Sequence, residues 1–208
     1  MKQFVWLNPV SMAMYGGPQL LEQLIKKGFE PVECQVDHIA AVREKYRQAV
    51  RGANGCVADV RCPLAVAYIK ERYAPDFLEY PAIEPILLHC ARELQREFSG
   101  QGTLIITTPC QSLKELGAGL KLPETEFCTF LELAAKAGIS LRKKDLEESP
   151  IPPGFFQEFG DVIQVLDSRD KIDRYFSGES ARGRERLLEL LYCAGGCHRG
   201  DGVQGAKT

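Results

Sequence analysis

The sequence lacks the features that mark several broad classes of protein. Its 208 residues carry 26 Lys and Arg against 28 Asp and Glu, which gives a formal net charge of −2. Without a marked basic excess the chain has little means of neutralising nucleic-acid phosphates, so we expect no nucleic-acid partner. No apolar run reaches the roughly 20 residues that a transmembrane helix needs, so we expect no membrane partner either.

The first residues also lack the long apolar segment of a secretory signal peptide. The apolar run at 4–7 is followed at once by Asn8 and Pro9, which end it too early. We therefore expect a cytoplasmic protein. Because disulfides are rare in a reducing cytoplasm, the 8 cysteines point to metal or redox chemistry rather than to a disulfide framework.

Short apolar runs alternate with helical patterns along the chain, which predicts an α/β fold with mainly parallel sheets flanked by helices. No strand is followed by a Gly-rich phosphate-binding loop, so a nucleotide site has little support. The break at Gly100-Gln101-Gly102 divides the single domain 1–208 into lobe one, about 1–100, and lobe two, about 101–192. A cluster-binding loop and tail, 193–208, follow, and we expect the part after Cys197 to be disordered. Six strands are predicted, at 4–7, 31–36, 55–60, 103–108, 126–130 and 161–166. Helices are predicted to begin near Gly16, His38, Cys62, Glu84, Leu131, Arg169 and Arg182.

Two cysteines come directly after predicted strands. Cys62 follows the strand that ends at Val60, and Cys110 follows the strand that ends at Thr108. Each lies beside a proline and leads into a helix or turn. In open α/β sheets ligands sit beyond the carboxyl ends of the strands, and free backbone N–H groups at helix N-termini favour thiolates. These positions are therefore candidate ligand sites.

Two further thiols bracket a pair of glycines in Cys193-Ala194-Gly195-Gly196-Cys197. A helix-like run, 186–192, leads into this motif. The glycines allow positive φ and a sharp change of direction, and they leave room for a bulky inorganic group. With Cys62 and Cys110, these cysteines supply four thiolates from three segments, the count for a [4Fe-4S] cube or for a tetrahedral zinc ion.

The remaining cysteines lie inside strand or helix patterns, and free cysteine is a common small core residue. We therefore predict a packing role only for Cys34, Cys56, Cys90 and Cys128. His38 and His89 fall on predicted helices as surface or core residues. His198 follows Cys197 and either lines the site or is solvated.

These cysteine motifs resemble those of the iron-only hydrogenases, in the large-subunit domain that holds the H-cluster. The stretch from Cys193 to Cys197 and the Gly-rich residues after it are similar to the family's C-terminal Cys-Pro-Gly-Gly-Cys motif. Arg61-Cys62-Pro63 is similar to its Cys-Cys-Pro motif, and Pro109-Cys110 to its Met-Pro-Cys motif. Weaker similarity covers nearly the whole chain, at Asn8-Pro9-Val10, in the helix from Leu131 to Ile139, and in 152–156, which is similar to a segment of hydrogenase-like sensory proteins.

The resemblance implies a two-lobed α/β domain with one [4Fe-4S] cluster in the cleft between the lobes. Its cube ligands would be the four cysteines of the three motifs. In the active members the last of them, Cys197 here, also bridges to a diiron centre that carries out the hydrogen chemistry. The implied ligands are Cys62, Cys110, Cys193 and Cys197.

The chain departs from the family where the diiron centre is held and served. Arg61 stands in place of the proton-relaying cysteine, and Leu113 in place of a lysine that binds a diiron cyanide. Lys114 is adjacent but would point elsewhere on the helix. Thr108 and Leu191 replace methionines. Arginine stays protonated at any working pH, so it cannot relay protons to and from an open iron.

The hypothesis that follows is a [4Fe-4S] cluster-binding, hydrogenase-like protein that does not turn over hydrogen. Its role would be redox sensing, electron transfer or partnership in a complex, with a ferredoxin or a larger complex subunit as redox partner. One alternative is a divergent hydrogenase or other cluster enzyme that keeps a catalytic centre. The other is a structural Cys₄ zinc site with a binding role, which the lack of two tight Cys-x-x-Cys knuckles weighs against.

Overall fold

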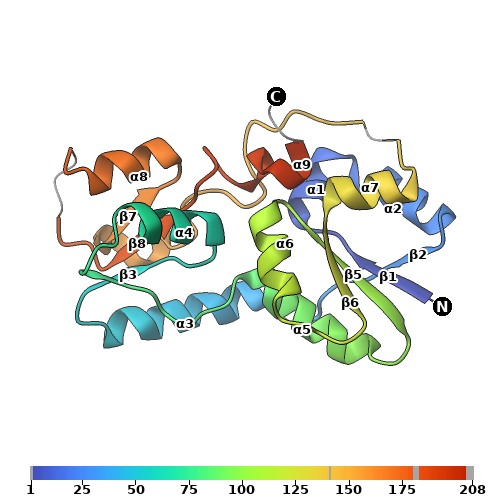
Figure 1. The fold of residues 1–208 in the computed structure, drawn as a ribbon, viewed down its shortest axis with the longest axis horizontal. Helices are drawn as coiled ribbons and strands as arrows, with labels where there is room; N and C mark the ends of the chain where they lie inside the picture. The colour runs from blue at the N-terminus through green and yellow to red at the C-terminus, as the bar shows by residue number, and fades with distance from the viewer. Residues whose placement is uncertain (1, 141, 180–182, 205–208) are drawn as a thin grey trace. The chain divides into compact units, whose positions relative to one another are not determined.

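A computed structural model describes residues 2–140, 142–179 and 183–204. The strands form two four-stranded sheets in which every neighbouring pair is parallel, and helices flank each sheet (Figure 1). This confirms the predicted fold class. The described residues divide into two compact units: those within 1–36, 87–151 and 197–208 form the first, and those within 37–86 and 152–196 form the second. Each unit takes segments from both sides of 100–102, whereas the lobes expected from the sequence were continuous.

The sheet of the first unit has the strand order β2-β1-β5-β6. Its strands are β1 (Lys2–Trp6), β2 (Phe29–Pro31), β5 (Gly102–Thr108) and β6 (Thr125–Thr129). The strand expected at 31–36 is therefore misplaced, since β2 ends at Pro31 and 32–37 form a loop. The helices of this unit are α1 (Pro9–Met14), α2 (Gly17–Lys26), α5 (Ile86–Phe98), α6 (Gln111–Ala118), α7 (Phe130–Ala137), the 3₁₀ turn η2 (Cys197–Arg199) and α9 (Asp201–Gln204).

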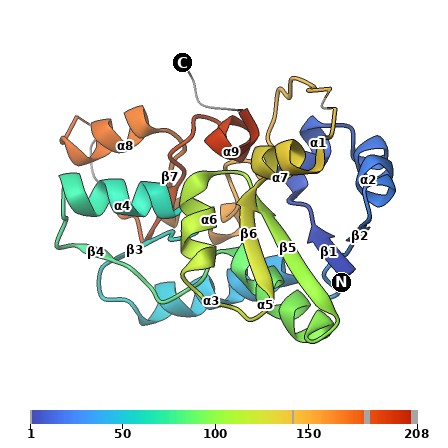
Figure 2. The same ribbon diagram turned by 45° about the vertical axis from the view of Figure 1, so that its right-hand side comes forward.

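Helices lie on both faces of this sheet (Figure 2). Side chains that alternate along β1 and β5 pack against them, so both faces are buried. Val5 and Ile105 pack with residues of α1, α2 and α7. Phe4 and Leu104 point to the opposite face and pack with α5. Because helices cover both faces, the strands read as continuous apolar runs, as expected for a parallel sheet.

The sheet of the second unit has the order β4-β3-β8-β7. Helices again cover both faces, with α4 and α8 packed on one side and α3 on the other. None of the helices in the described part of the chain combines the length and apolarity needed to cross a bilayer. The elements are α3 (His38–Gly52), β3 (Cys56–Ala58), α4 (Pro63–Arg72), β4 (Leu78–Glu79), the 3₁₀ segment η1 (Gln157–Val162), β7 (Ile163–Leu166), α8 (Arg169–Phe176) and β8 (Leu187–Leu190).

The helix expected over 186–192 is wrong, because Leu187–Leu190 form the inner strand β8. All four of its residues are buried. Leu188 packs toward α4 and α8, whereas Leu187 packs toward α3. A short strand buried on both faces has the same unbroken apolar pattern as a piece of buried helix, so periodicity could not separate them. The helix expected from Arg182 begins on 180–182, outside the described residues.

The C-terminal tail was expected to be disordered, which is wrong as far as residue 204. Residues 197–204 form η2 and α9 on the first unit. Val203 is fully buried, and the Tyr15 hydroxyl donates a hydrogen bond to its carbonyl oxygen at 2.5 Å. One buried valine anchors this segment without any apolar periodicity that a sequence pattern would reveal. Residues 205–208 lie outside the described part.

Candidate metal centres

Cys62 lies at the N-terminus of α4, shortly after β3, as the pattern of strand, cysteine and proline predicts. It is the N-cap residue, and Pro63 is the first residue of the helix, where a missing N–H costs nothing. Burial raises the pKa of the Cys62 thiol, and the backbone N–H groups of Ala65, Tyr192 and Leu64 oppose that rise in part. The sulfur therefore faces several backbone donors in a buried setting.

The segment that carries Cys193 runs beside Cys62 within the second unit. Tyr192, whose N–H faces the Cys62 sulfur, is the residue immediately before Cys193. The cause is sheet topology: β3 and β8 are neighbouring parallel strands, with Ala58 opposite Leu188. Both strands end at the carboxyl edge of the sheet, so the residues that follow β3 and β8 are neighbours.

Cys110 and the segment after Cys197 meet in the same way within the first unit. Cys110 is the N-cap of α6, directly after β5. The Gly202 N–H donates to the Pro109 carbonyl oxygen at 3.0 Å. A carboxylate oxygen of Asp201 accepts a hydrogen bond from the Gln111 N–H at 2.9 Å. The C-terminal segment is thus fastened to the residues on both sides of Cys110.

Two glycines make this close approach possible. A Cβ atom on Gly200 would lie 2.4 Å from the Pro109 carbonyl oxygen, and one on Gly202 would lie 2.8 Å from the Pro109 carbonyl carbon. Neither separation is tolerated between real atoms, so only glycine lets the two backbones touch here. The Gly-rich composition of the C-terminal segment therefore reflects packing against the Cys110 loop.

The link from Cys193 to Cys197 turns through two left-handed glycines, as the sequence predicted. Gly195 has φ 75° and Gly196 has φ 120°. The Gly196 N–H donates to the Cys193 carbonyl oxygen at 3.0 Å, and the Gly195 N–H donates to the Asp167 carbonyl oxygen at 3.2 Å. Each unit thus holds segments of two of the four predicted ligands, and this link joins the two pairs. That all four bind one cluster stays a prediction.

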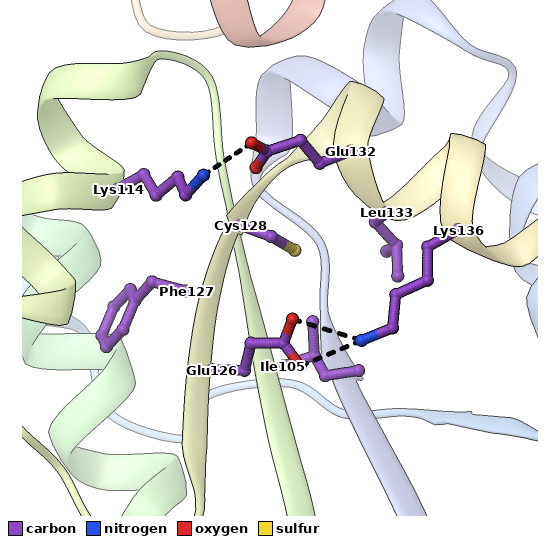
Figure 3. A pocket seen from close by; sticks show the side chains of 8 residues that line it. All are labelled: Ile105, Lys114, Glu126, Phe127, Cys128, Glu132, Leu133 and Lys136. Atoms are coloured by element: carbon purple, nitrogen blue, oxygen red, sulfur yellow. Dashed lines mark hydrogen bonds and ion pairs between the residues drawn. The ribbon is translucent and has the colours of Figure 1, made fainter.

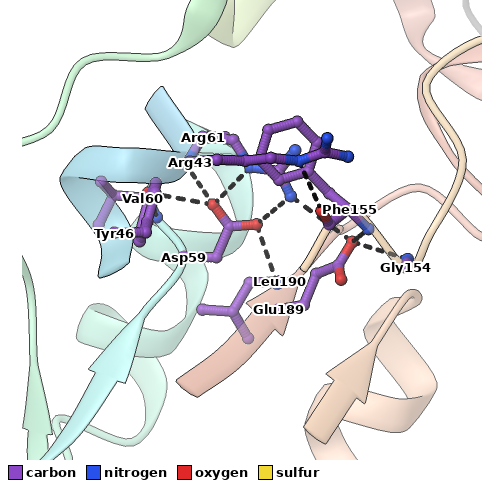
Figure 4. Close-up of polar contacts among 9 residues, drawn as sticks. All are labelled: Arg43, Tyr46, Asp59, Val60, Arg61, Gly154, Phe155, Glu189 and Leu190. Carbon is purple, nitrogen blue, oxygen red and sulfur yellow. Dashed lines mark hydrogen bonds and ion pairs between the residues drawn. The ribbon is translucent and has the colours of Figure 1, made fainter. Parts of the chain in front are cut away.

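Arg61, the residue before Cys62, lies in a buried charge cluster of the second unit (Figure 4). Its Nε and Nη2 donate to the two carboxylate oxygens of Asp59 at 2.9 and 2.7 Å. The Tyr46 hydroxyl also donates to Asp59, at 3.2 Å, and accepts the Val60 N–H at 2.8 Å. The guanidinium carbon lies 3.7 Å from the centre of the Phe155 ring. The arginine side chain is therefore held by the carboxylate of Asp59 and packed against the Phe155 ring.

Glu189, on β8, is the second carboxylate of this cluster. Its Oε1 accepts the N–H groups of Gly154 and Phe155 at 2.9 and 3.0 Å and lies 3.5 Å from Nη2 of Arg61. Its Oε2 is buried and has no hydrogen-bond partner among the described residues. Burial raises the pKa of Glu189, and the Phe155 N–H and Arg61 offset this only in part. Burial opposes the charge of Arg61 as well, but Asp59 raises the net pKa of its guanidinium, which remains a cation.

The other positions that depart from the hydrogenase pattern offer no ligand to a diiron unit. Leu113 and Leu191 are buried apolar side chains. The Thr108 hydroxyl lies 3.0 Å from the Cys110 carbonyl oxygen and 3.3 Å from that of Cys128, so it serves the backbone. Lys114 pairs with Glu132 of α7 at 2.5 Å. The chemistry of these side chains therefore does not fit the diiron part of an H-cluster.

Cys56 and Cys128 are buried core residues of the second and first unit. Burial raises the pKa of each thiol to about 12, so both stay protonated at neutral pH. Cys128 lies on the wall of a cavity of about 230 Å³, which is also lined by the Lys114–Glu132 and Lys136–Glu126 ion pairs (Figure 3). Since those charges neutralise one another, the cavity presents no unmatched charge to a ligand.

Cys34 and Cys90 lie together in the first unit. Their sulfur atoms lie within 4.8 Å of each other. Cys34 lies on the loop after β2, His38 begins α3, and Cys90 lies on α5. Cys34 and Cys90 do pack in the core of this unit, and a role limited to packing stays a prediction for them, as does a surface or core position for His38. The misplaced strand at 31–36 hid the loop that carries Cys34.

Glu93, one helical turn after Cys90, fastens this loop to α5. One carboxylate oxygen accepts the backbone N–H groups of Gln35 at 2.6 Å and Val36 at 3.3 Å. At the end of the loop, Asp37 caps α3 by accepting the Ala40 N–H at 2.9 Å. The carboxylates of Glu93 and Asp37 thus fix the backbone of the loop after Cys34 and the first turn of α3.

The Cys34 and Cys90 thiols also interact with each other. A hydrogen bond with Cys90 raises the pKa of Cys34, and burial and the negative charges of Glu93 and Glu97 add to the rise. The same hydrogen bond lowers the pKa of Cys90, against the opposing effects of burial and Glu93. The Cys34 and Cys90 thiols therefore share one hydrogen bond.

His198, which was expected either to line the site or to be solvated, is buried with 4% of its surface exposed. Its Nδ1 has no hydrogen-bond partner among the described residues, and burial lowers the pKa of its imidazole. Solvation is therefore excluded for this side chain in the C-terminal segment.

Comparison with known proteins leaves the family open. No protein-family model matches the chain, and a search of curated proteins found no match. The fold thus defines a class only: an α/β protein with two four-stranded parallel sheets flanked by helices. The likeness to the iron-only hydrogenases depends on the motifs themselves.

Proposed function

We propose that this protein binds one [4Fe-4S] cluster through the cysteines of its three motifs and uses it in redox sensing, electron transfer or a complex, without turning over hydrogen. The observation that supports this is the pairing of ligand segments inside each unit. Tyr192 connects Cys62 with the Cys193 segment, and Gly202 connects the Cys110 loop with the segment after Cys197. The proposed ligands are Cys62, Cys110, Cys193 and Cys197.

The link between Cys193 and Cys197 is short, which limits the distance between the two pairs of proposed ligands. Only three residues separate Cys193 from Cys197. A chain of that length spans at most ~14 Å even when fully extended. The sulfurs that bind one cube are on the order of 6–7 Å apart, so the link permits both pairs to serve the same cluster.

The setting of Cys62 suits a cluster thiolate. Backbone N–H groups directed at cluster sulfurs stabilise their negative charge and raise the reduction potential. Ala65, Tyr192 and Leu64 supply such groups at Cys62. Arg61 does not add a net charge there, because it is paired with Asp59. Its backbone N–H also donates to Asp59 at 3.0 Å, which fixes the turn that leads into Cys62.

The same residues argue against hydrogen chemistry. A hydrogenase needs a group that gives and takes a proton beside the open iron. Arg61 is a buried, paired cation, and Leu113 presents only hydrocarbon. A cluster held by the four cysteines without these diiron contacts would suit redox sensing, electron transfer or a role in a complex, with a ferredoxin or a larger complex subunit as partner.

Anaerobic reconstitution with iron and sulfide tests this proposal. We expect about four irons and four sulfides per chain and a [4Fe-4S] signal by electron paramagnetic resonance after reduction. Serine at any of the four proposed ligands should lower the iron content several-fold. Cys56→Ser and Cys128→Ser are matched controls, because both thiols are buried in the hydrophobic cores of their units and are not among the proposed ligands.

Each of the other possible outcomes would favour a different interpretation of the metal site. Equal iron loss in ligand and control variants would show that the ligands are wrongly chosen. Extra iron with infrared bands of bound CO and cyanide would favour a divergent hydrogenase. Zinc without sulfide, lost in the same four variants, would favour the Cys₄ zinc site.

A further inference from the structure

We propose that Cys34 and Cys90 form a reversible disulfide by exchange with a small-molecule disulfide such as oxidised glutathione. Both cysteines belong to the first unit, so the pair lies within one compact body. Neither is a proposed cluster ligand. The inference therefore goes beyond the function proposed above and is tested separately from it.

The two sulfurs are close enough to bond after a change of side-chain rotamer. They lie within 4.8 Å of each other, and the thiols share a hydrogen bond. A disulfide brings two sulfurs to about 2.05 Å. Rotation about one Cα–Cβ bond by one staggered step moves a sulfur by ~3 Å, which is enough to cover that difference.

Glu93 holds the loop of Cys34 against the helix of Cys90. Cys90 and Glu93 lie about one turn apart on α5. One oxygen of the Glu93 carboxylate accepts the backbone N–H of Gln35, the residue after Cys34, at 2.6 Å and that of Val36 at 3.3 Å. The loop is thus attached to α5 beside Cys90, which gives the two thiols a high effective concentration toward each other.

The bond would also close a long loop of the chain. Residues 35–89 lie between the two cysteines and include the whole segment 37–86 of the second unit. A link between points so far apart in the sequence restricts the unfolded chain far more than the folded one. The oxidised protein should therefore be the more stable form, so the disulfide would couple the redox state of the surroundings to the stability of the fold.

The two sulfurs differ in access, which sets the order of the exchange. Cys34 is partly exposed, whereas Cys90 is 6% exposed. The Cys34 thiolate attacks one sulfur of oxidised glutathione, its S–S bond breaks, and one glutathione leaves as a thiolate that takes up a proton.

The second step takes place inside the protein. The Cys90 thiolate attacks the Cys34 sulfur, the mixed S–S bond breaks, and the second glutathione leaves and takes up a proton. The two cysteine thiols thus lose two electrons and two protons, and one oxidised glutathione becomes two reduced molecules. An excess of reduced glutathione reverses both steps.

Incubation in glutathione redox buffers tests the proposal, with full-length protein whose cluster has first been reconstituted anaerobically. Alkylation of the remaining thiols, followed by peptide mass mapping, measures the bond between Cys34 and Cys90. We expect a linked peptide pair about 2 Da lighter than its two reduced peptides, and its loss in excess reduced glutathione. Oxidation should also shift the denaturant midpoint upward, and Cys34→Ser should remove that shift.

Replacement of each cysteine separates the two steps. Cys90→Ser should stop the reaction at the mixed disulfide, so that glutathione stays on Cys34 and adds about 305 Da. Cys34→Ser should abolish both products, because solvent does not reach the buried Cys90. Cys56→Ser and Cys128→Ser are the matched controls and should form the disulfide as the unmodified protein does. Circular dichroism identifies any variant that fails to fold, and the partly exposed Cys34 keeps the test decisive if Cys90→Ser does.

Glu93 is a positioning residue in this proposal, and Glu97 provides its control. The hydrogen bond with Cys90, burial and the charges of both carboxylates raise the pKa of Cys34, so removal of either carboxylate favours the thiolate. Glu93 also holds the loop. At a fixed glutathione ratio, Glu93→Ala should therefore lower the disulfide fraction several-fold, whereas Glu97→Ala should not lower it.

The failures that would overturn the proposal are distinct from those of the cluster. They are the absence of a Cys34–Cys90 peptide at every glutathione ratio, bonds from Cys34 to other cysteines in equal yield, and an oxidised form no more stable than the reduced one. Cys34→Ser should keep its iron and sulfide, whereas Cys62→Ser should lose iron and still form the disulfide. If no cluster forms in any sample, peptide mapping still decides the disulfide, and only the function proposed above fails.

Discussion

Arg61 and Asp59 are joined by two hydrogen bonds from the guanidinium, at 2.9 and 2.7 Å, and by one from the Arg61 backbone N–H, at 3.0 Å. Their side chains are 8% and 0% exposed. The arginine before Cys62 is thus part of the structure of its unit. Its removal would leave Asp59 and Glu189 buried without their cation.

The first prediction concerns that pair. Arg61→Met keeps much of the side-chain stem over Phe155 but removes the charge, so it should lower the free energy of unfolding by about 3–5 kcal/mol. Arg47→Met is the control, because Arg47 pairs with Glu158 at the surface, where an ion pair contributes about 0–1 kcal/mol. Denaturant unfolding of both variants measures the difference. Equal losses in the two variants would contradict the structural role of Arg61.

The second prediction concerns pH. Burial raises the folded-state pKa of Glu189 above its ordinary value of about 4.3. The folded state therefore holds this proton longer than the unfolded state, so the stabilisation is present below about pH 4.3 and is lost as pH rises through the folded-state pKa. Glu189→Gln should remove this decline, seen as a smaller change in unfolding free energy between about pH 4 and 7. An unchanged pH profile would count against a raised pKa.

Asp173 provides a comparison of opposite sign. Hydrogen bonds from Tyr68 and Tyr73 lower its folded-state pKa. Its stabilising effect is therefore present above the unfolded pKa, about 3.9, and is lost as pH falls through the folded-state value. Asp173→Asn should flatten the acid limb of the stability profile, whereas Glu189→Gln should act on the limb above it. Identical profiles for the two variants would contradict the assignment.

The third prediction concerns the close approach at Gly200. A methyl group there would meet the Pro109 carbonyl oxygen, so Gly200→Ala should push the C-terminal segment away and cost about 1–3 kcal/mol of stability. Gly52→Ala is the matched control, because a Cβ on Gly52 meets nothing within 4 Å. The rate of proteolytic cleavage in the segment after residue 196 measures its displacement, and denaturant unfolding measures the loss of stability. If both variants resist cleavage equally, the glycine is not needed for docking.

Local features of the fold could be predicted from the sequence. The prolines after Cys62 and before Cys110 mark strand-to-helix junctions, and Gly195 and Gly196 have the positive φ that their pairing suggested. These signals are local, since they depend on backbone preferences within a few residues. The parallel sheets followed from the alternation of strands and helices.

Features that depend on distant contacts could not be predicted. The apolar pattern of Leu187–Leu190 does not say whether a helix or a doubly covered strand forms, and the anchoring of Val203 depends on Tyr15. The cluster of Asp59, Arg61 and Glu189 exists because β3 and β8 are neighbours. The Cys34–Cys90 pair likewise requires the loop after β2 to reach α5. No short sequence window contains these pairings.

The last prediction is that the protein does not evolve or oxidise hydrogen at an enzymatic rate, even when it is matured with the hydrogenase assembly machinery. General acid–base catalysis is typically worth ~10²–10⁴-fold in rate, and the group at the relay position is a paired, buried cation. Arg61→Cys with Leu113→Lys should not restore turnover. The cysteine would leave two buried carboxylates without a cation, and the lysine would replace a side chain that is 8% exposed.

Hydrogen production with a strong reductant and a mediator, together with infrared spectra of iron-bound CO and cyanide, measures this outcome. An active iron-only hydrogenase matured in parallel is the control for the assembly machinery. The buried contacts of Thr108 and Leu191 would remain in the double variant and still offer no thioether to a diiron unit. Sustained turnover accompanied by those infrared bands would overturn the non-catalytic proposal in favour of a divergent hydrogenase.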